Sequence, residues 1–454
     1  MQIQLNDTII APATPQGISA IAVVRLSGKN CIHLVQQVFF GKDLTTVPTH
    51  TIHFGTIRDD DRIIDEVLVS VFHEGTSYTS ENAVEISCHG SPVVVKEIIN
   101  LLVKKGARLA QPGEFTKRAF LHGRLDLTQA EAVADIIHAE TENARQAAIN
   151  QMRGGFSKEI NRLRDELIHF ASLIELELDF GEEDVEFAKR DELKNLILKI
   201  QYFVQSLVQS FDQGNVIKNG VPTVIAGRPN AGKSTLLNLL LNEERAIVSD
   251  IPGTTRDVIE DEMVLNGIAF RFIDTAGLRE TSDTIEAIGV ERTRQQMEKA
   301  SLILYVIDLT DTTPQAVQQE ETELKNLGIP YILIGNKLDK ARPELIEKLK
   351  KNLVLISASK HTNIEALKEA ILTRVHVNRV KTGDVLVTNV RHYQNLLQTK
   401  DALQRVLEGM EKGITGDFLA MDIRQALHFL GEITGAITTD DLLENIFSKF
   451  CIGK

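Results

Sequence analysis

The stretch GRPNAGKS, residues 227–234, follows the apolar run Val221–Ala226 and precedes TLLNLLL, residues 235–241. This order predicts a strand, a glycine-rich loop and a helix, and the spacing fits the phosphate loop G-x-x-x-x-G-K-[ST]. Glycines let the backbone approach phosphate oxygens, and the following helix adds about half a positive charge at its N-terminus. The stretch therefore predicts a nucleotide site.

Two side chains of this loop have specific expected roles. The ammonium of Lys233 would reach the outer phosphates, and the hydroxyl of Ser234 would bind Mg²⁺. The backbone of the loop and the first residues of the helix would surround the phosphates. The residues expected in these contacts are Asn230, Ala231, Gly232, Lys233, Ser234 and Thr235.

Two downstream motifs supply the expected partners of the γ-phosphate and the metal. The apolar run Phe270–Ile273 ends at DTAG, residues 274–277, whose carboxylate could hold the magnesium shell and whose glycine could donate to a γ-phosphate. GTTRD, residues 253–257, offers Thr255 as a further magnesium ligand. The residues expected here are Thr255, Asp274, Thr275, Ala276 and Gly277.

Two later motifs predict that the base is guanine. NKLD, residues 336–339, follows an apolar run, and Asp339 could accept two hydrogen bonds from the guanine N1–H and amine. Adenine lacks those donors and would leave the carboxylate unpaired, which discriminates strongly. Each motif follows an apolar strand, where open α/β sheets bind ligands, so a Ras-like GTPase domain is expected. The expected base contacts are Asn336, Lys337, Leu338, Asp339, Ser357, Ala358 and Ser359.

The glutamine that positions the attacking water in many small GTPases is missing, because Leu278 follows DTAG. The water must be oriented from elsewhere, by an arginine of a partner or by a bound cation. Arg279 and Glu286 lie in a polar segment suited to a switch, although an exposed loop charge is an equally good interpretation of either.

Composition and charge narrow the class of protein. The chain of 454 residues is 43% hydrophobic and 25% charged, and its length suggests about three domains. The sequence offers neither a signal peptide nor an apolar run of bilayer length, and its three cysteines have no metal-binding spacing, so a cytoplasmic protein without a membrane partner is expected. The net charge of −13 argues against strong non-specific electrostatic binding of nucleic acid.

The pattern of apolar residues predicts four segments. In residues 1–118, strands are expected over 18–26, 51–57, 63–72 and 83–88 and a helix over 91–105, which predict an α+β domain. Glu85 lies opposite the apolar face of its strand and is either solvated or in a pocket. Long helices are expected over 119–215 and again over 377–454. Each helical half has a wide apolar stripe, so we expect one helical domain, split in sequence, with the GTPase domain of residues 216–376 inserted.

Blocks outside the GTPase motifs give the chain a specific resemblance. They include PGEFT at 112–116, LDL at 125–127, IGVER at 288–292 and CIGK at 451–454. With the GTPase motifs, these blocks resemble the MnmE (TrmE) family of tRNA modification GTPases over the whole length. The family has an N-terminal domain, a split helical domain and an inserted GTPase domain, in agreement with the pattern above.

The resemblance implies a reaction and its partners. With an FAD-containing partner, MnmG (GidA), in a heterotetramer, the family adds an aminomethyl or carboxymethylaminomethyl group at C5 of the wobble uridine of certain tRNAs. The N-terminal domain dimerises and binds a tetrahydrofolate, as the 5-formyl or 5,10-methylene form. By motif, the folate contacts would be Arg25, Glu85, Arg124 and Lys454.

The resemblance also implies how the attacking water is oriented and how the transition-state charge is neutralised without the glutamine. The GTPase domains of the family depend on K⁺, which here would be bound by Asn230, Ser249, Ile251 and Thr254, within a nucleotide-contacting segment that also holds Asp250, Pro252 and Gly253. The cation would neutralise transition-state charge. Glu286 would orient the water and, with Asp274 and Lys233, complete the expected catalytic groups.

Two other classes of GTPase fit the sequence less well. A ribosome-assembly switch would be expected to carry a basic RNA-binding module, which residues after 376 do not resemble. A filament-forming or membrane-remodelling GTPase would be expected to carry a basic amphipathic helix or coiled-coil arms, and the acidic composition argues against it.

Overall fold

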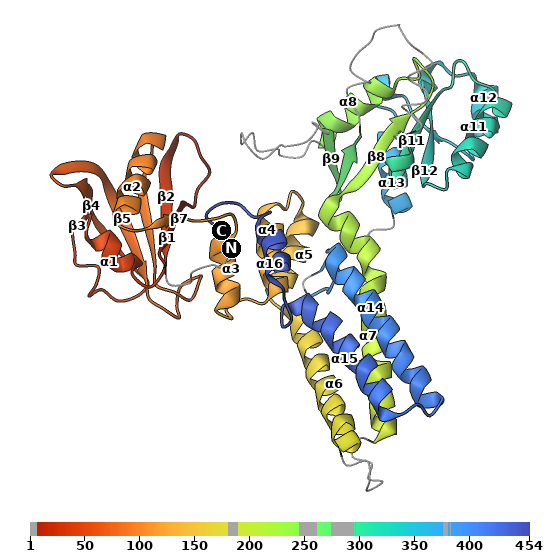
Figure 1. Cartoon of the computed structure of the whole chain (residues 1–454). Coiled ribbons are helices and arrows are strands. Elements are labelled where there is room, and N and C mark those ends of the chain that lie inside the picture. The colour runs from red at the N-terminus through yellow and green to blue at the C-terminus, as the bar shows by residue number, and fades with distance from the viewer. Residues whose placement is uncertain are drawn as a thin grey trace. The chain divides into compact units, whose positions relative to one another are not determined.

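The computed structural model describes residues 7–179, 189–244, 261–273, 295, 297–375, 380, 381 and 383–454. These residues form two compact units, each assembled from separate stretches of the chain (Figure 1). The first unit contains Met1–Ile137, Gln151–Gln201 and Asn395–Lys454, and the second contains His138–Asn150 and Tyr202–Gln394. The expected α+β domain, split helical domain and inserted GTPase domain are confirmed as the fold class.

A seven-stranded sheet dominates the N-terminal part of the first unit. Its strand order is β3-β4-β5-β6-β2-β1-β7, antiparallel except between β1 and β7. The strands are β1 (Ile9–Pro12), β2 (Ser19–Ser27), β3 (Phe39–Phe40), β4 (Thr51–Asp59), β5 (Arg62–Phe72), β6 (Ala83–Gly90) and β7 (Arg108–Leu109).

The two faces of this sheet differ. Helices α1 (Cys31–Gln36) and α2 (Pro92–Lys104) pack with the buried residues of one face, such as Val24 and Ile86, into a single core. On the other face, Phe115 of α3 (Glu114–Leu121) packs over β1. Arg25 and Glu85 point to this second face, because strand side chains alternate between faces.

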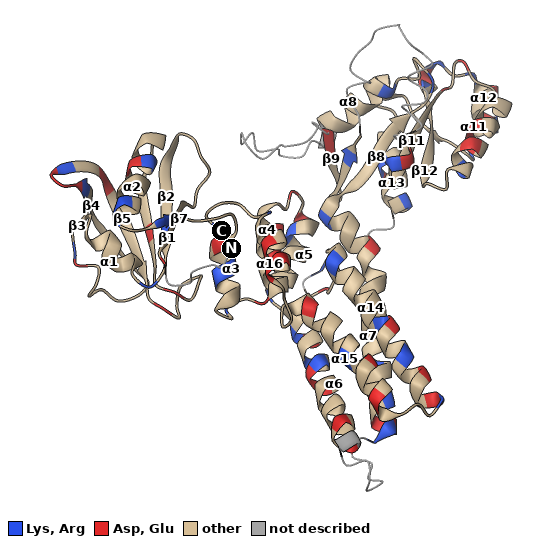
Figure 2. Ribbon diagram, viewed as in Figure 1, with Lys and Arg blue, Asp and Glu red and all other residues tan. Residues whose placement is uncertain are grey.

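The rest of the first unit is helical. Apolar residues at helical spacing are buried in it, including Leu163, Leu167 and Ile174, as the sequence predicts. Figure 2 shows acidic and basic side chains interspersed along its long helices. The helices of this region are α4 (Leu127–Ile137), α5 (Glu142–Met152), α6 (Gly155–Asp179), α7 (Arg190–Asn219), α14 (Val390–Glu411), α15 (Gly416–Thr434) and α16 (Asp440–Phe447), of which α5, α7 and α14 continue into the second unit.

The second unit contains a six-stranded sheet of order β13-β12-β11-β8-β10-β9, parallel except for β9 at one edge. Apolar cores form on both faces, as expected of a doubly wound fold. Its strands are β8 (Val221–Ala226), β9 (Asp261–Leu265), β10 (Ile268–Phe272), β11 (Leu302–Asp308), β12 (Tyr331–Asn336) and β13 (Val354–Leu355). Its helices are α8 (Lys233–Glu244), α11 (Pro314–Asn326), η1 (Leu338–Lys340), α12 (Pro343–Leu349), η2 (Ala358–Lys360) and α13 (Ile364–Val375).

A search of the described residues finds no helix long and apolar enough to cross a membrane.

Candidate functional site

The phosphate loop lies between β8 and α8, as its spacing predicts. Three of its residues have positive φ: Gly227 (138°), Asn230 (57°) and Gly232 (94°). A Cβ on Gly227 would lie 2.1 Å from the carbonyl oxygen of Val306, so no larger residue fits there. The loop is therefore held tightly against β11, with Asn230 exposed in the left-handed conformation.

The side chain of Lys233 folds back over the start of the phosphate loop. Its Nζ donates to the carbonyl oxygens of Gly227 and Arg228, each at 2.9 Å. Burial lowers the pKa of the ammonium. Arg228 is held in turn by an ion pair of 2.6 Å between its Nε and Oε1 of Glu320. The geometry keeps a positive charge at the loop, where a phosphate group could receive it.

Asn336 connects the phosphate loop with the two base-recognition motifs. Its Nδ2 donates to the carbonyl oxygen of Ala231 at 2.9 Å, and its Oδ1 accepts from the backbone N–H of Ala358 at 3.0 Å. A Cβ on Gly232 would lie 2.3 Å from the same Nδ2, so the second glycine makes room for this contact. The structure thus gives Asn336, which the sequence predicts only as a base contact, a positioning role between three loops.

The side chain of Asp339, in the short helix η1, is exposed. Ser357 donates through Oγ to its Oδ1 at 2.6 Å, and this hydrogen bond lowers the pKa of the carboxyl. Lys337 adopts φ 63° and places its Nζ 2.5 Å from Oδ2 of Asp308, a partner that the motif spacing does not reveal. A charged carboxylate is therefore available to two donors of a guanine edge.

The remaining base-site residues follow from these contacts. Leu338 is fixed through its backbone N–H, which donates to the carbonyl oxygen of Ile356, and Ser359 lies with its Oγ 3.4 Å from that of Ser357. Ser234 and Thr235 lie in the first turn of α8. The other expected contacts lie outside the described residues: Ser249, Asp250, Ile251, Pro252, Gly253, Thr254, Thr255, Asp274, Thr275, Ala276, Gly277 and Glu286.

A second cluster of predicted site residues lies in the first unit. Arg25 and Glu85 are direct cross-strand partners on β2 and β6, with Nε and Nη2 of the arginine 2.8 and 2.7 Å from Oε1 of the glutamate. Nη1 of Arg25 donates to the carbonyl oxygen of Gly453 at 3.2 Å. The guanidinium also lies 6.0 Å from the ring centre of Tyr78 and 5.8 Å from that of Phe115.

The C-terminal tail completes this cluster. Gly453 has φ 93°, and a Cβ there would lie 2.2 Å from the carbonyl oxygen of Pro12. The carbonyl oxygen of Cys451 accepts from the backbone N–H of Gly113, so the tail is tied to the start of α3. Burial and the nearby charge of Arg25 lower the pKa of Lys454.

The chemistry of this donor set suits a flat, polar heterocycle. The guanidinium of Arg25 lies near two aromatic rings, while the second carboxylate oxygen of Glu85 could accept N–H groups and Lys454 could bind an anionic group. The residues present therefore fit a folate, with one exception. Arg124 is exposed after α3, and among the described residues no hydrogen bond or ion pair joins its side chain to the cluster.

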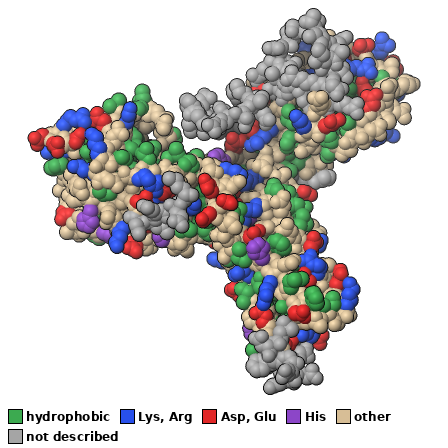
Figure 3. All heavy atoms as spheres, viewed as in Figure 1, with side chains coloured by type: hydrophobic (Ala, Val, Ile, Leu, Met, Phe, Trp, Pro, Cys, Tyr) green, Lys and Arg blue, Asp and Glu red, His purple; other side chains and the backbone are tan. Residues whose placement is uncertain are grey.

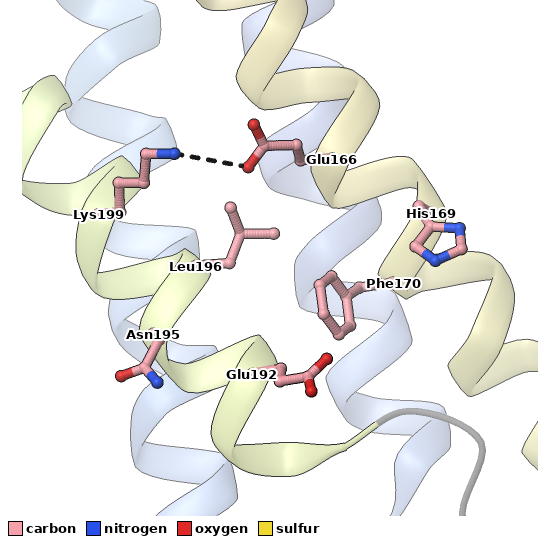
Figure 4. Close-up of a pocket in the computed structure, with 7 residues that line it drawn as sticks. All are labelled: Glu166, His169, Phe170, Glu192, Asn195, Leu196 and Lys199. Carbon is pink, nitrogen blue, oxygen red and sulfur yellow. Dashed lines mark ion pairs between the residues drawn. The ribbon is translucent and has the colours of Figure 1, made fainter.

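A cavity of about 360 Å³ lies elsewhere, between α6 and α7 (Figure 4). The side chains of Phe170 and Leu196 occupy the space between the helices, and Lys199 pairs with Glu166 at 3.7 Å. None of the residues predicted for nucleotide or folate lines it. The lining residues are Glu166, His169, Phe170, Glu192, Asn195, Leu196 and Lys199.

The sheet order, the phosphate loop and the exposed carboxylate of the NKLD motif are those of a P-loop GTPase. Two family models match the parts around it: the MnmE helical domain over residues 127–451 and the GTP-binding protein TrmE N-terminus over residues 8–124. The chain belongs to the MnmE family of tRNA modification GTPases, which confirms the resemblance found in the sequence.

Full-length relatives support this assignment. A tRNA modification GTPase MnmE from Cytophaga hutchinsonii is 57% identical over 451 residues, covering 99% of this chain and 98% of the relative. That from Christiangramia forsetii is 51% identical and covers 99% and 100%. A crystal structure of a point variant of Era from Aquifex aeolicus, bound to GDP·AlF₄⁻, is 28% identical over 40% of this chain and 66% of its own, with a TM-score of 0.27, and carries no weight here.

Proposed function

We propose that this chain hydrolyses GTP with Mg²⁺ and K⁺ and, with an FAD-containing MnmG subunit, modifies C5 of the wobble uridine of certain tRNAs in the cytoplasm. The product would carry an aminomethyl or carboxymethylaminomethyl group. The observation that carries the proposal is the full-length likeness to proteins named tRNA modification GTPase. The geometry adds two candidate sites, one for GTP and one for a tetrahydrofolate that supplies the one-carbon unit.

In the nucleotide site, the fixed positive charge of Lys233 and the hydroxyl of Ser234 support binding of a magnesium–nucleotide complex. Asp339, held by Ser357, supports selection of guanine. We assign Thr255 and Asp274 to the metal shell and Glu286 to the attacking water on their place in the sequence motifs alone. Hydrolysis then depends on charge neutralisation at the γ-phosphate.

We assign that neutralisation to K⁺ at Asn230, with oxygens from Ser249, Ile251 and Thr254. Asn230 is exposed in a left-handed conformation at the tip of the phosphate loop, where its amide oxygen could reach a cation. The test is the rate of GTP hydrolysis in K⁺ against Na⁺. We expect a drop of about 10-fold or more in Na⁺, lost in Asn230→Ala, since a charge partner in this place supplies several kcal/mol. Equal rates in both salts would exclude the cation.

Arg25, Glu85 and Lys454 are assigned to the folate, because their donors, acceptor and adjoining aromatic rings fit a pterin better than a sugar or phosphate alone. For Arg124, only its positive charge supports a role in folate binding.

The second sheet face also supports homodimer formation. Ile52, Phe54 and Leu68 lie on this face of neighbouring strands and are 65%, 66% and 46% exposed. Figure 3 shows hydrophobic side chains at the surface of this domain.

The reaction is tested by nucleoside mass spectrometry of tRNA from cells that lack this chain. We expect the C5-modified wobble uridine to disappear and to return when the chain is restored. An unchanged modification together with accumulating precursors of ribosomal subunits would contradict the proposal and favour an assembly switch.

A further inference from the structure

The start of α5 is joined to the GTPase sheet by one buried side chain. Asn143 is 3% exposed, and its Nδ2 donates to the carbonyl oxygen of Asn266 at 3.3 Å. Its Oδ1 accepts from the backbone N–H of Val380 at 3.4 Å. One amide thus contacts both the β9–β10 turn and the chain that leaves the GTPase domain after α13.

The β9–β10 turn is shaped to receive this amide. Asn266 and Gly267 have φ 49° and 77°, which is typical of a two-residue type I′ hairpin turn. A Cβ on Gly267 would lie 3.0 Å from Nδ2 of Asn143, so the glycine keeps the approach open. The turn and the amide therefore fit closely, and the hairpin cannot shift without moving or losing Asn143.

A second contact flanks the first. Arg271 on β10 pairs across the hairpin with Glu262 on β9, Nε to Oε1 at 2.7 Å, and lies 3.9 Å from Oε2 of Glu140. Glu140 precedes α5, and its carboxyl lies near enough to Glu262 to raise the pKa of that residue. Side chains from before and within the first turn of α5 thus hold the same two strands.

The hairpin occupies a special place in the chain. The motif GTTRD, residues 253–257, precedes β9, and DTAG, residues 274–277, follows β10. In GTPases of this class the γ-phosphate orders these two motifs and hydrolysis releases them. The other end of α5, Gln151 and Met152, belongs to the first unit, so one helix continues from the hairpin contact into that unit.

We propose that Asn143 is a positioning residue that couples nucleotide-dependent changes in the β9–β10 hairpin to helix α5, and through α5 to the modification reaction. The link from α5 to the modification reaction rests on the proposed function, whereas the coupling of hairpin and helix does not. Asn143 touches neither the phosphate loop nor the base motifs in the described residues. Its loss should therefore change coupling and leave GTP affinity within twofold of the wild type.

The same helix supplies a matched control. Nδ2 of Asn150 donates to the carbonyl oxygens of Lys381 and Asp384 at 2.9 and 3.1 Å, and its Oδ1 accepts from Gly383 N–H at 3.2 Å. Asn150 thus contacts the chain after α13 but not the hairpin. Comparing Asn143→Ala with Asn150→Ala separates the hairpin contact from general attachment of α5.

The direct test is hydrogen exchange of residues 142–152 in the full chain, with GDP and with GDP·AlF₄⁻. We expect the protection of this peptide to differ between the two nucleotides in the wild type and in Asn150→Ala, and to become equal in Asn143→Ala. Asn143→Gln, which keeps the amide, should restore part of the difference. A wild-type response in Asn143→Ala, or an equal loss in Asn150→Ala, would overturn the inference.

The functional readout is tRNA modified per GTP hydrolysed, measured with the partner subunit. Asn143→Ala should lower this ratio about fivefold, the effect of one hydrogen bond, with the hydrolysis rate unchanged. A wild-type protein that hydrolyses GTP without modifying tRNA would contradict the proposed function, while leaving the exchange experiment to decide the coupling. An unchanged ratio in Asn143→Ala would contradict the link to modification.

Discussion

The nucleotide site and the Arg25–Glu85 site are built in opposite ways. The first is made of loops at strand ends, where backbone groups would do most of the binding. Asn336 connects three of these loops, each of which carries a short sequence motif. The second is made of side chains in the middle of two strands and of a tail 428 residues away from Arg25. Motif spacing therefore reveals the first site, whereas only tertiary structure assembles the second.

This difference has a consequence for robustness. A backbone-built loop tolerates many side-chain changes but not a misplaced glycine, because a Cβ at Gly227 would meet a carbonyl oxygen at 2.1 Å. The side-chain site includes Phe115 of α3, which lies against Arg25, and the same helix carries Arg118, which pairs with three carboxylates. Changes in one site should therefore leave the other intact.

The largest expected effect is a change of base specificity in the nucleotide site. Asp339→Asn replaces the acceptor of the guanine amine by a donor, which suits the C2 carbonyl of xanthine. GTP affinity should fall about 10³-fold and XTP affinity should rise, because mismatched polar groups are left unpaired. Competition binding with labelled nucleotides measures both. Ser359→Ala, at the edge of the same site, should change GTP affinity less than threefold; retained GTP selectivity in Asp339→Asn would refute the assigned base contact.

A smaller effect is expected for Arg118 on α3, the helix that brings Phe115 to the second site. Arg118 is fully buried and contacts Asp7, Glu81 and Glu114 at 2.5, 3.1 and 3.1 Å. Arg118→Ala leaves buried carboxylates uncompensated and should lower the free energy of unfolding of the N-terminal domain by about 3 kcal/mol.

The control for this change is Arg108→Ala, in which the removed side chain is 41% exposed and shares two of the same carboxylates. It should cost about 1 kcal/mol. Hydrogen exchange of β2 and β6 reports the stability of the domain, and GDP affinity reports the other site. A fall in GDP affinity alongside the loss of protection would show that the two regions are not independent.

The smallest effect concerns pH and the hairpin that carries β9. Burial and the neighbouring carboxyl of Glu140 raise the pKa of Glu262 to about 7, although the Arg271 guanidinium opposes this shift. A raised carboxyl pKa means that the folded state binds the proton more tightly than the unfolded chain, so stability is lost as pH rises through 7. Glu262→Gln should raise Tm by about 2–4 °C at pH 8, or about 1 kcal/mol, and leave it unchanged at pH 5.

Thermal unfolding at the two pH values, compared with Glu140→Gln, checks the assignment. Either substitution removes the repulsion, so both should flatten the pH dependence. A pH profile identical to that of the wild type in both variants would show that this pair of carboxyls does not set the pH dependence.

Much of the fold could be predicted because long elements repeat their pattern. The expected strands at 51–57, 63–72 and 83–88 correspond to β4, β5 and β6, and the helix at 91–105 to α2. Elements such as β3, β7 and α1 were missed, since two to six residues give too little periodicity to detect.

The candidate sites were predictable to different degrees for the same reason. Lys233 and Asp339 can each be predicted from the spacing within one motif. Their hydrogen bonds to the carbonyl oxygen of Arg228 and to the hydroxyl of Ser357 depend on how the loops fold. Tyr78 carries no local signal, and the PGEFT block that contains Phe115 does not show that its ring lies against Arg25, because both contacts form only in the folded domain. Arg25 itself came from the resemblance, and sequence spacing could not have found the carbonyl of Gly453.

The most direct test of two independent sites is calorimetric titration of the purified full chain with GDP·Mg²⁺ and with 5-formyltetrahydrofolate. The account predicts that Lys233→Ala loses nucleotide affinity about 100-fold and binds the folate like the wild type, since charge-assisted hydrogen bonds are worth about 1.5–3 kcal/mol each. Glu85→Ala should show the reverse. A wild-type chain that does not bind the folate, or a variant that loses both ligands, would contradict the account.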